Sequence, residues 1–419
     1  MSTKRWTQAG AVAAVAALLL AACGNGDGGG GGGTDGGGGG GGDGDTDDPI
    51  VIGVSLPLTG DFAEPGKGVQ RGYETWVEMV NANGGLLGRQ VELIVLDDAS
   101  DPARVVSDYE SLIAQEEVDL LFGPFSTRLV VPASRVASEY GMLFVEPAAA
   151  APEVFENGFE NIFYAAPAIA SDHYNYLADY ILAMPEDERP QTMAVTSMDD
   201  PFAQGTAYGL RDALVEAGVE LVVDEVYPPN ATDMSAIAAQ IADADPDLLV
   251  GGSLYQDAVN LILALQQLNY QPRMVAFSTA PTNPEFPEAI GGAVDGILSP
   301  TGYSLTADWP SNAPFIEMHN EIHGMDPQED EANGYTTGQV VQAAVEAVGC
   351  AEQGECQQQL IDWLHENSVE DTVVGPLGWD EAGRPDGAHM LLQYQEGEIT
   401  IVLPEDAAQA ELLYPKPEW

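Results

Sequence analysis

From Ile50 to Phe277 the chain alternates between short apolar runs and longer amphipathic stretches. Short apolar runs fit strands buried on both faces of a sheet, and the amphipathic stretches fit helices that cover such a sheet. The alternation therefore predicts an α/β fold with mainly parallel strands. The expected strands are 50–56, 91–96, 118–122, 142–145, 192–196, 221–227, 248–250 and 274–277, and the expected helices are 68–81, 102–115, 129–140, 172–184, 203–217, 235–242 and 257–268.

These units form two series, which predicts two doubly wound, Rossmann-like lobes. Further helices are expected at 312–323, 334–348 and 356–366, followed by a β-rich piece at 389–403. The late helices need a sheet to cover, so the simplest topology returns the chain to the first lobe. Several hinge strands would then join the lobes beside a ligand-binding cleft at the strand ends. The expected parts are an N-terminal lobe of 49–168 and 303–378, a C-terminal lobe of 169–302 and 379–405, and a tail of 406–419.

The first residues have the pattern of a secretory signal. Lys4 and Arg5 precede an apolar run at 11–20 that is too short to span a bilayer, and small residues stand just before Cys23. Leu20-Ala21-Ala22-Cys23 resembles the lipobox of bacterial lipoproteins. The resemblance implies a signal peptide at 1–22 and a lipidated Cys23 that anchors the protein to the cell membrane on its extracytoplasmic side. An ordinary signal peptide with an incidental cysteine is the alternative.

A glycine tract with scattered aspartates follows at 24–44. Such a composition cannot bury a core, so we expect a disordered tether over 23–48. The tract contains the spacing of a dinucleotide-binding loop, but no expected strand precedes it and no expected helix follows it. A nucleotide cofactor site is therefore excluded there.

The formal net charge is −54, from 67 acidic and 13 basic residues. Nucleic acid is an improbable partner, because its binding needs a basic surface. We interpret the acidity as a solvated, halophilic-type surface suited to high salt. An acidic binding function is the weaker interpretation.

The two cysteines of the mature body could form a disulfide in an oxidising compartment. Cys350 and Cys356 are separated by a short segment that contains Gly354. Metal binding is the weaker alternative, because the sequence has neither Cys-x-x-Cys spacing nor two histidines nearby. His319 and His323 lie four residues apart on an expected helix, without an adjacent acidic motif. We therefore expect no metal site.

Enzyme signatures are lacking along the chain. It contains neither Gly-x-Ser-x-Gly nor His-Glu-x-x-His, and no glycine fingerprint follows the first expected strand. These absences argue against a hydrolase, a zinc protease and a nicotinamide enzyme. We therefore expect neither an enzyme nor a cofactor.

Five segments carry a resemblance to a known family. They are IGVSLPLTG (52–60), NANGGLLGR (81–89), DDASDP (97–102), FGPFST (122–127) and GPLGWD (375–380). In this order they resemble the type I periplasmic substrate-binding proteins, in the branch of leucine/isoleucine/valine-binding proteins, over residues 50–403. The resemblance implies that a small solute, such as an amino acid, is captured and delivered to the permease and ATPase subunits of an ABC importer. A receptor that senses its ligand with the same fold is the alternative.

The first lobe offers a candidate carboxylate site. Residues 123–127 lie between an expected strand and an expected helix, where hydroxyls and free N–H groups suit an anion. With the resemblance, we expect Thr127 to contact the ligand, with Ser126 and Phe125 as further candidates. Simple capping of the helix is the alternative. After the next strand, Ala148 would offer a backbone group, and Ala150 stands where related amino-acid binders often place a threonine.

The second lobe departs from the family pattern. Ala280 occupies the position at which amino-acid binders usually carry the acid that neutralises the ligand's ammonium group. A buried ammonium without a carboxylate is costly, so Asp199, Asp200 or Glu146 would have to compensate, or the ligand lacks an amine. Phe202 matches an aromatic position that covers the ligand, with helix-start packing as the alternative. An aromatic wall of Tyr255, Tyr303 and Tyr335 is a weaker expectation.

Overall fold

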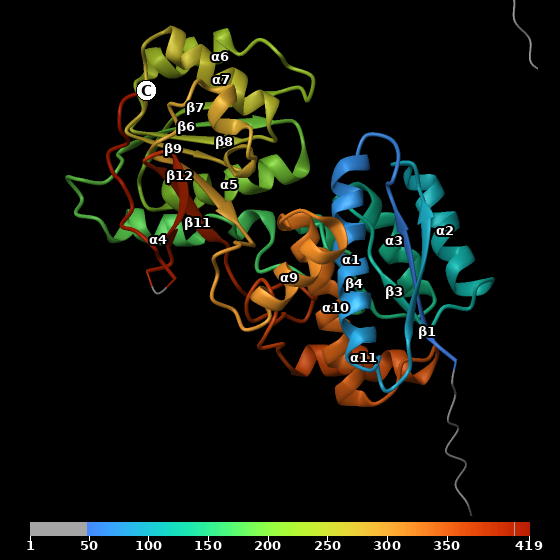
Figure 1. Ribbon diagram of the computed structural model, residues 1–419. Coiled ribbons are helices and arrows are strands. Elements are labelled where there is room, and N and C mark those ends of the chain that lie inside the picture. Colours follow the sequence, from blue (N-terminus) through green and yellow to red (C-terminus); the bar gives the residue numbers. More distant parts are fainter. Residues whose placement is uncertain (1–47, 406) are drawn as a thin grey trace, which may run out of the picture. The chain divides into compact units, whose positions relative to one another are not determined.

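The computed structural model describes residues 48–405 and 407–419 (Figure 1). The expected signal peptide at 1–22, Cys23 and all but the last residue of the expected tether at 23–48 lie outside the described residues. Among the described helices, none combines the length and the apolar character needed to cross a membrane.

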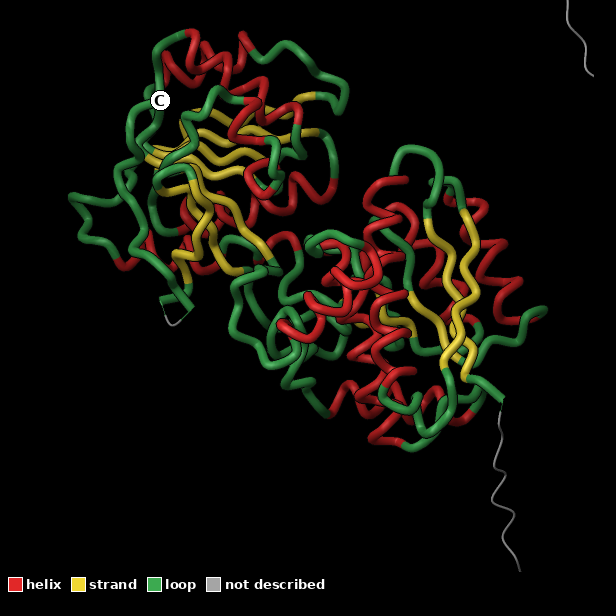
Figure 2. The backbone as a smooth tube through the Cα atoms, in the orientation of Figure 1, coloured by secondary structure: helices red, strands yellow, loops and turns green. Residues whose placement is uncertain are grey.

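The first sheet has five parallel strands in the order β2-β1-β3-β4-β5. Figure 2 shows strands in yellow and helices in red. This is the strand order of flavodoxin-like doubly wound sheets, in which the chain reverses its direction of winding between β1 and β3. The strands are β1 (Ile50–Leu56), β2 (Val91–Asp97), β3 (Leu120–Phe122), β4 (Phe144–Glu146) and β5 (Ile162–Tyr164). Three helices connect them: α1 (Ala63–Ala82), α2 (Pro102–Ala114) and α3 (Thr127–Glu139).

The second sheet has seven strands in the order β7-β6-β8-β9-β10-β11-β12. Its first five strands are parallel and repeat the order of the first sheet, and β11 and β12 are added antiparallel. The strands are β6 (Thr192–Met198), β7 (Glu220–Tyr227), β8 (Leu248–Gly252), β9 (Met274–Phe277), β10 (Ile297–Thr301), β11 (Met390–Gln395) and β12 (Glu398–Leu403). The helices are α4 (Asn175–Ala183), α5 (Pro201–Glu216), α6 (Ser235–Ala244), α7 (Gln256–Gln267) and α8 (Phe286–Ala289).

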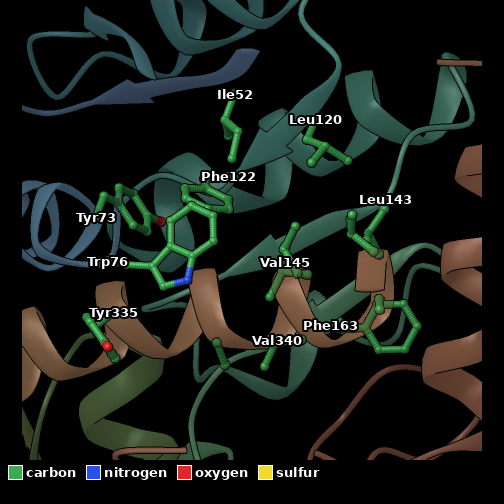
Figure 3. Packing of buried hydrophobic residues seen from close by; sticks show 14 of the residues in the cluster. Ile52, Tyr73, Trp76, Leu120, Phe122, Leu143, Val145, Phe163, Tyr335 and Val340 are labelled. Atoms are coloured by element: carbon green, nitrogen blue, oxygen red, sulfur yellow. The ribbon is translucent and has the colours of Figure 1, made fainter. Parts of the chain in front are cut away.

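The late helices return to the first lobe, as expected. They are α9 (Asn312–His323), α10 (Glu329–Val348) and α11 (Glu355–Glu366). Their apolar side chains share one core with α1 and the first sheet, as Figure 3 shows for Trp76, Phe122 and Val340. The two expected lobes are thus two α/β units, each with its own sheet and core. The exact boundaries assigned to them stay a prediction.

Several elements differ from the expected ones. The short strands β5 and β10 were not expected, because β5 has only three residues and β10 has the sequence ILSPT, in which apolar and polar residues are mixed. The helix expected from residue 172 begins with a 3-10 turn at Ala170–Asp172, and α4 starts at Asn175. The helix expected from residue 334 begins at Glu329, where Gln328 and Glu331 form a capping box.

Two segments that connect the sheets meet in a pair of histidines. His173 follows the connection from β5, and His389 lies just before β11. Their rings stack with centroids 3.8 Å apart, and both side chains are buried. No sequence pattern indicated this contact, because the two residues lie far apart in the chain.

The expected disulfide between Cys350 and Cys356 is formed in the structure. Together with Glu352, these residues are the one group in the described part of the chain whose ligand atoms lie close enough for a metal ion. The disulfide uses both sulfur atoms. His319 is buried, and its Nδ1 lies 2.9 Å from the Met325 carbonyl oxygen, which gives the ring a structural contact.

Candidate functional site

The candidate residues follow the carboxyl ends of neighbouring parallel strands. In the first lobe, Thr127 follows β3 and Ala148 follows β4. In the second lobe, Phe202 follows β6, Tyr255 follows β8 and Ala280 follows β9. Ligands of doubly wound sheets bind outside this edge, at the strand pair where winding reverses. In the first lobe that pair is β1 and β3, whose following loops touch through Phe62 and Phe125, with ring centroids 6.0 Å apart.

The start of α3 leaves polar groups open. Its N-cap residue, Ser126, makes no side-chain capping hydrogen bond, and its Oγ is shielded from solvent without a partner in the structure. The first N–H groups of a helix have no partner within the helix, and the helix dipole makes this end positive. Ser126 also has a φ of 78° and a ψ of 144°, a backbone conformation that costs about 1–3 kcal/mol in a residue with a side chain. An anion would find unsatisfied donors here.

Glu146, the last residue of β4, fills part of the same edge. Its carboxyl Oε2 accepts hydrogen bonds from the amides of Ala148 at 2.8 Å and Ala149 at 2.7 Å. The Ala148 N–H that could have met a ligand is therefore already bound within the chain. Burial raises the pKa of Glu146 to about 8, against the opposing effect of these two amides. The sequence signal for this role is an acid at the end of an apolar strand, directly before a proline.

Phe202, at the start of α5, packs against residues that follow strands β4 and β5 of the first sheet. Ala150, Tyr164 and the first residues after β5 form a small buried apolar cluster, and Phe202 contacts it. The Phe202 ring also meets the His173 ring edge-on, with centroids 5.7 Å apart. Phe202 is half-buried, so part of its ring remains open to solvent. The structure thus brings Ala150 and Phe202 together.

Ala280 lies in the core of the second lobe. It is 1 % exposed, begins a 3-10 turn and belongs to the same apolar cluster as Phe277 and Phe286. Tyr255 is the half-buried N-cap residue of α7 and packs at the edge of that cluster. These surroundings give both residues a packing role.

The three acids proposed to replace the missing carboxylate differ in their surroundings. Asp200 caps α5, accepting from the amides of Phe202 and Ala203, both at 3.0 Å. Asp199 is exposed beside Gln204. Glu146 is the only one of the three that is fully buried.

Two tyrosines of the expected aromatic wall are core residues. Tyr303 and Tyr335 are buried in the first lobe and pack against Phe315, with ring centroids 6.0 Å and 4.5 Å from it. Their burial favours the structural interpretation of these two tyrosines over a ligand wall, because the same apolar cluster that contains α1 and α10 encloses them.

Two surface hollows lie away from all candidate residues. One, of about 440 Å³, lies between β7 and α6. The other, of about 260 Å³, lies beside the end of α3 and includes Ser138 and Gln358. The expected ligand-binding cleft therefore stays a prediction.

Comparison with known proteins identifies a family and solved structures that share the fold. The family model described as "Periplasmic binding protein" matches residues 49–398. The Leu/Ile/Val-binding protein homolog 7 of Brucella suis is 27% identical over 392 residues, covering 88% of this chain and 94% of that protein.

Two solved structures share the fold. The branched-chain amino acid transporter substrate binding protein LivJ of Streptococcus pneumoniae, in complex with isoleucine, has a TM-score of 0.70 at 20% identity and covers 88% of this chain and 100% of its own. A solute binding protein of an ABC transporter from R. palustris, in complex with benzoate, has a TM-score of 0.70 at 20% identity and covers 88% of this chain and 98% of its own.

Proposed function

The chain belongs to the periplasmic binding protein family, and on this premise we propose that it captures an amino acid or similar small carboxylate and delivers it to the permease of an ABC transporter. As a member it is an extracytoplasmic solute-binding protein with the type I fold, and not an enzyme. The solute and the partner subunits are the proposed part.

The start of α3 is the observation that carries the carboxylate proposal. A strained Ser126, a shielded hydroxyl without a partner and the positive end of a helix of 13 residues coincide at the winding reversal of the first sheet. A ligand carboxylate would satisfy these donors. Ligand docking on this lobe, followed by closure that brings Phe202 over it, is the proposed binding sequence, with the ligand favouring the closed population.

Isothermal titration tests the proposal. The panel contains branched-chain, aromatic and acidic amino acids, then amine-free aromatic acids and the corresponding amides. We expect tight binding of at least one carboxylate and loss of binding of its amide. A protein that binds amides as well as acids, or binds nothing in the panel, would contradict the carboxylate proposal.

An amine-free aromatic acid is the second candidate ligand. Ala280 has no carboxylate, and that of Asp200 is engaged as a helix cap, so neither residue offers a free carboxylate to an ammonium group. The benzoate-binding relative gives modest support. Binding of benzoate in preference to isoleucine would favour this candidate, and tight isoleucine binding would overturn it.

The proposed membrane anchor is a lipid on Cys23, a residue outside the described part of the chain. The test is the partition of the protein into detergent after expression in a bacterium. We expect the wild type to enter the detergent phase and Cys23→Ser to remain in the aqueous phase. Equal partition of the two proteins would rule the anchor out.

A further inference from the structure

We propose that Glu146 is a ligand-contacting, specificity-determining residue of the first-lobe site, whose Oε1 donates a hydrogen bond to an acceptor oxygen of the bound solute. The inference rests on the proposed function, because it needs a carboxylate-bearing solute at this site. Glu146 would be a further ligand contact, and its hydrogen bond would favour solutes that present an anionic group to it.

The carboxyl group has one satisfied and one unsatisfied oxygen. Oε2 accepts from the amides of Ala148 and Ala149, whereas Oε1 is shielded from solvent and has no hydrogen-bond partner in the structure. Buried polar atoms in proteins are nearly always paired, so an unpaired one marks a place where a ligand group or an ordered water can bind. A solute oxygen would supply the missing partner.

The side chain of Glu146 packs against the loop that leads to α3. A β-carbon added to Gly123 would lie 2.4 Å from the Glu146 Cβ, so the loop after β3 packs directly on the Glu146 side chain. The same loop carries Ser126, whose Oγ is the second shielded atom without a partner. Two unsatisfied polar atoms on adjacent loops thus lie at one edge of the sheet.

The neutral form of the carboxyl makes Oε1 a donor. Burial raises the pKa of Glu146 to about 8, so below that pH the group is mainly protonated. Because two amides point at Oε2, the proton belongs on Oε1, since an amide donor and an O–H donor would otherwise face each other. A neutral acid can donate to an anionic solute, whereas an ionised one would repel it.

Two tyrosines are the titratable groups that feel the charge of Glu146, and the acids of α10 act on one of these tyrosines. Tyr73 from α1 and Tyr164 from β5 both feel its charge, and burial raises the pKa of each tyrosine far above neutrality. Tyr164 also feels Glu329 and Asp330. Burial and the charges of Glu331 and Glu329 raise the pKa of Asp330 to about 8, so this residue is the control for any titration near that pH.

The test is titration of benzoate and L-isoleucine into the full-length wild type, E146Q, E146A and D330N by calorimetry at pH 6 and pH 9. For a carboxylate probe that binds at pH 6, we expect the wild-type affinity to fall about tenfold by pH 9, the consequence of a pKa near 8. Binding at pH 9 should take up a proton, seen in buffers of different ionisation enthalpy. E146Q keeps a donor, so its affinity should stay near the wild-type value at pH 6 and change little with pH. D330N should behave as the wild type.

The outcomes separate the inference from the function on which it rests. If neither probe nor any other carboxylate of the panel binds the wild type at pH 6, the proposed function fails and the inference fails with it. If a carboxylate binds, but its affinity is flat with pH and E146A binds it as the wild type does, only the inference is overturned. A pH dependence that persists in E146Q and vanishes in D330N would overturn it as well. Unfolding midpoints of all four proteins identify any variant that has lost its fold.

Discussion

Carboxylates at the ends of strands bind amides of their own loops in both lobes. Glu146 accepts from two amides after β4, and Asp200 accepts from two amides after β6. Such contacts satisfy backbone donors that would otherwise be unpaired. They also decide which polar groups remain for a ligand: in the first lobe, these are the hydroxyls and N–H groups at the start of α3 and the Oε1 of Glu146.

Replacing Thr127 by alanine should weaken the binding of a carboxylate ligand. Thr127 is the first residue of α3, and loss of its hydroxyl would leave a buried ligand oxygen short of a partner, at a cost of about 1–3 kcal/mol. Calorimetric titration with the tightest acid of the panel measures the effect. Thr127→Ser keeps the hydroxyl and should bind nearly as the wild type. An unchanged affinity of the alanine variant would remove Thr127 from the site.

Asp200→Ala should destabilise the protein by about 1 kcal/mol, the usual cost of losing an N-cap. The reason is that Asp200 caps α5 through the amides of Phe202 and Ala203. Denaturant unfolding measures the change. Asp200→Asn retains an acceptor oxygen and should be close to the wild type in stability and in ligand affinity. If Asp200→Asn keeps the wild-type stability but binds the ligand more weakly, Asp200 instead neutralises an ammonium group of the ligand.

Helices α1 and α10 approach each other closely. A β-carbon added to Gly338 would lie 2.2 Å from the indole ring of Trp76. The indole N–H of Trp76 lies on the same face and donates to Gln342 at 3.1 Å. Glycine lowers helix propensity, yet here it permits the close packing that holds the returning helices to the first sheet.

Gly338→Ala should therefore destabilise the protein by about 1–3 kcal/mol through overpacking, although alanine favours helices. Ala347→Gly, at an exposed position in the last turn of the same helix, gives the propensity effect alone and should cost less than about 1 kcal/mol, the value for a helix interior. The free energy of unfolding in denaturant measures both. Higher stability of Gly338→Ala would mean that the helices are not in close contact.

The disulfide between Cys350 and Cys356 joins the end of α10 to the start of α11. It closes a short loop, for which chain entropy predicts a stabilisation of about 2 kcal/mol. We expect the double variant Cys350→Ser/Cys356→Ser to lose about this amount, measured by thermal unfolding. Thiol labelling of the unfolded, unreduced wild type should find neither cysteine free. Labelling of both would contradict the bond.

Over the whole molecule, buried ionisable groups set the pH dependence of stability. Burial raises the pKa of both Glu146 and Asp330 to about 8, so their folded forms hold protons that the unfolded chain releases near pH 4. Their contribution to stability is complete at low pH and is lost as the pH rises through 8. His173 has the opposite effect on stability, because burial lowers its pKa to about 4. This effect is confined to pH values below 6.5. Burial lowers the pKa of Lys416 to about 8. Above pH 8 the effect of Lys416 on stability is therefore opposite in sign to that of the carboxyls.

The temperature of the unfolding midpoint should therefore decrease as the pH rises from 6.5 to 8, because the two carboxyls titrate alone among these groups in that range. The double variant Glu146→Gln/Asp330→Asn should show a flatter profile over this range. Thermal unfolding at constant ionic strength measures both profiles, because the net charge of −54 makes stability depend on salt. A wild-type midpoint that rises from pH 6.5 to pH 8 would contradict the assignment.

The sequence alone determined the alternation of strands and helices, the two lobes and the return of the late helices. The reason is that periodicity and caps depend on residues that are close in sequence, so they can be recognised without the tertiary structure. The acidic residues that begin α10, Glu329 to Glu331, concealed its first turn, and β5 and β10 were too short to recognise. The disulfide could also be foreseen, because its two cysteines lie six residues apart.

The tertiary structure alone decided how the polar groups at the strand ends are used. Whether Asp200 caps a helix, whether Ala280 lies in a core and whether Glu146 keeps an unpaired oxygen depend on contacts among loops that come from different strands. The same holds for the stacking of His173 on His389, which joins segments remote in sequence. Residue types set what each side chain can donate or accept, but three-dimensional packing determines which partners are within reach and which groups water can no longer satisfy.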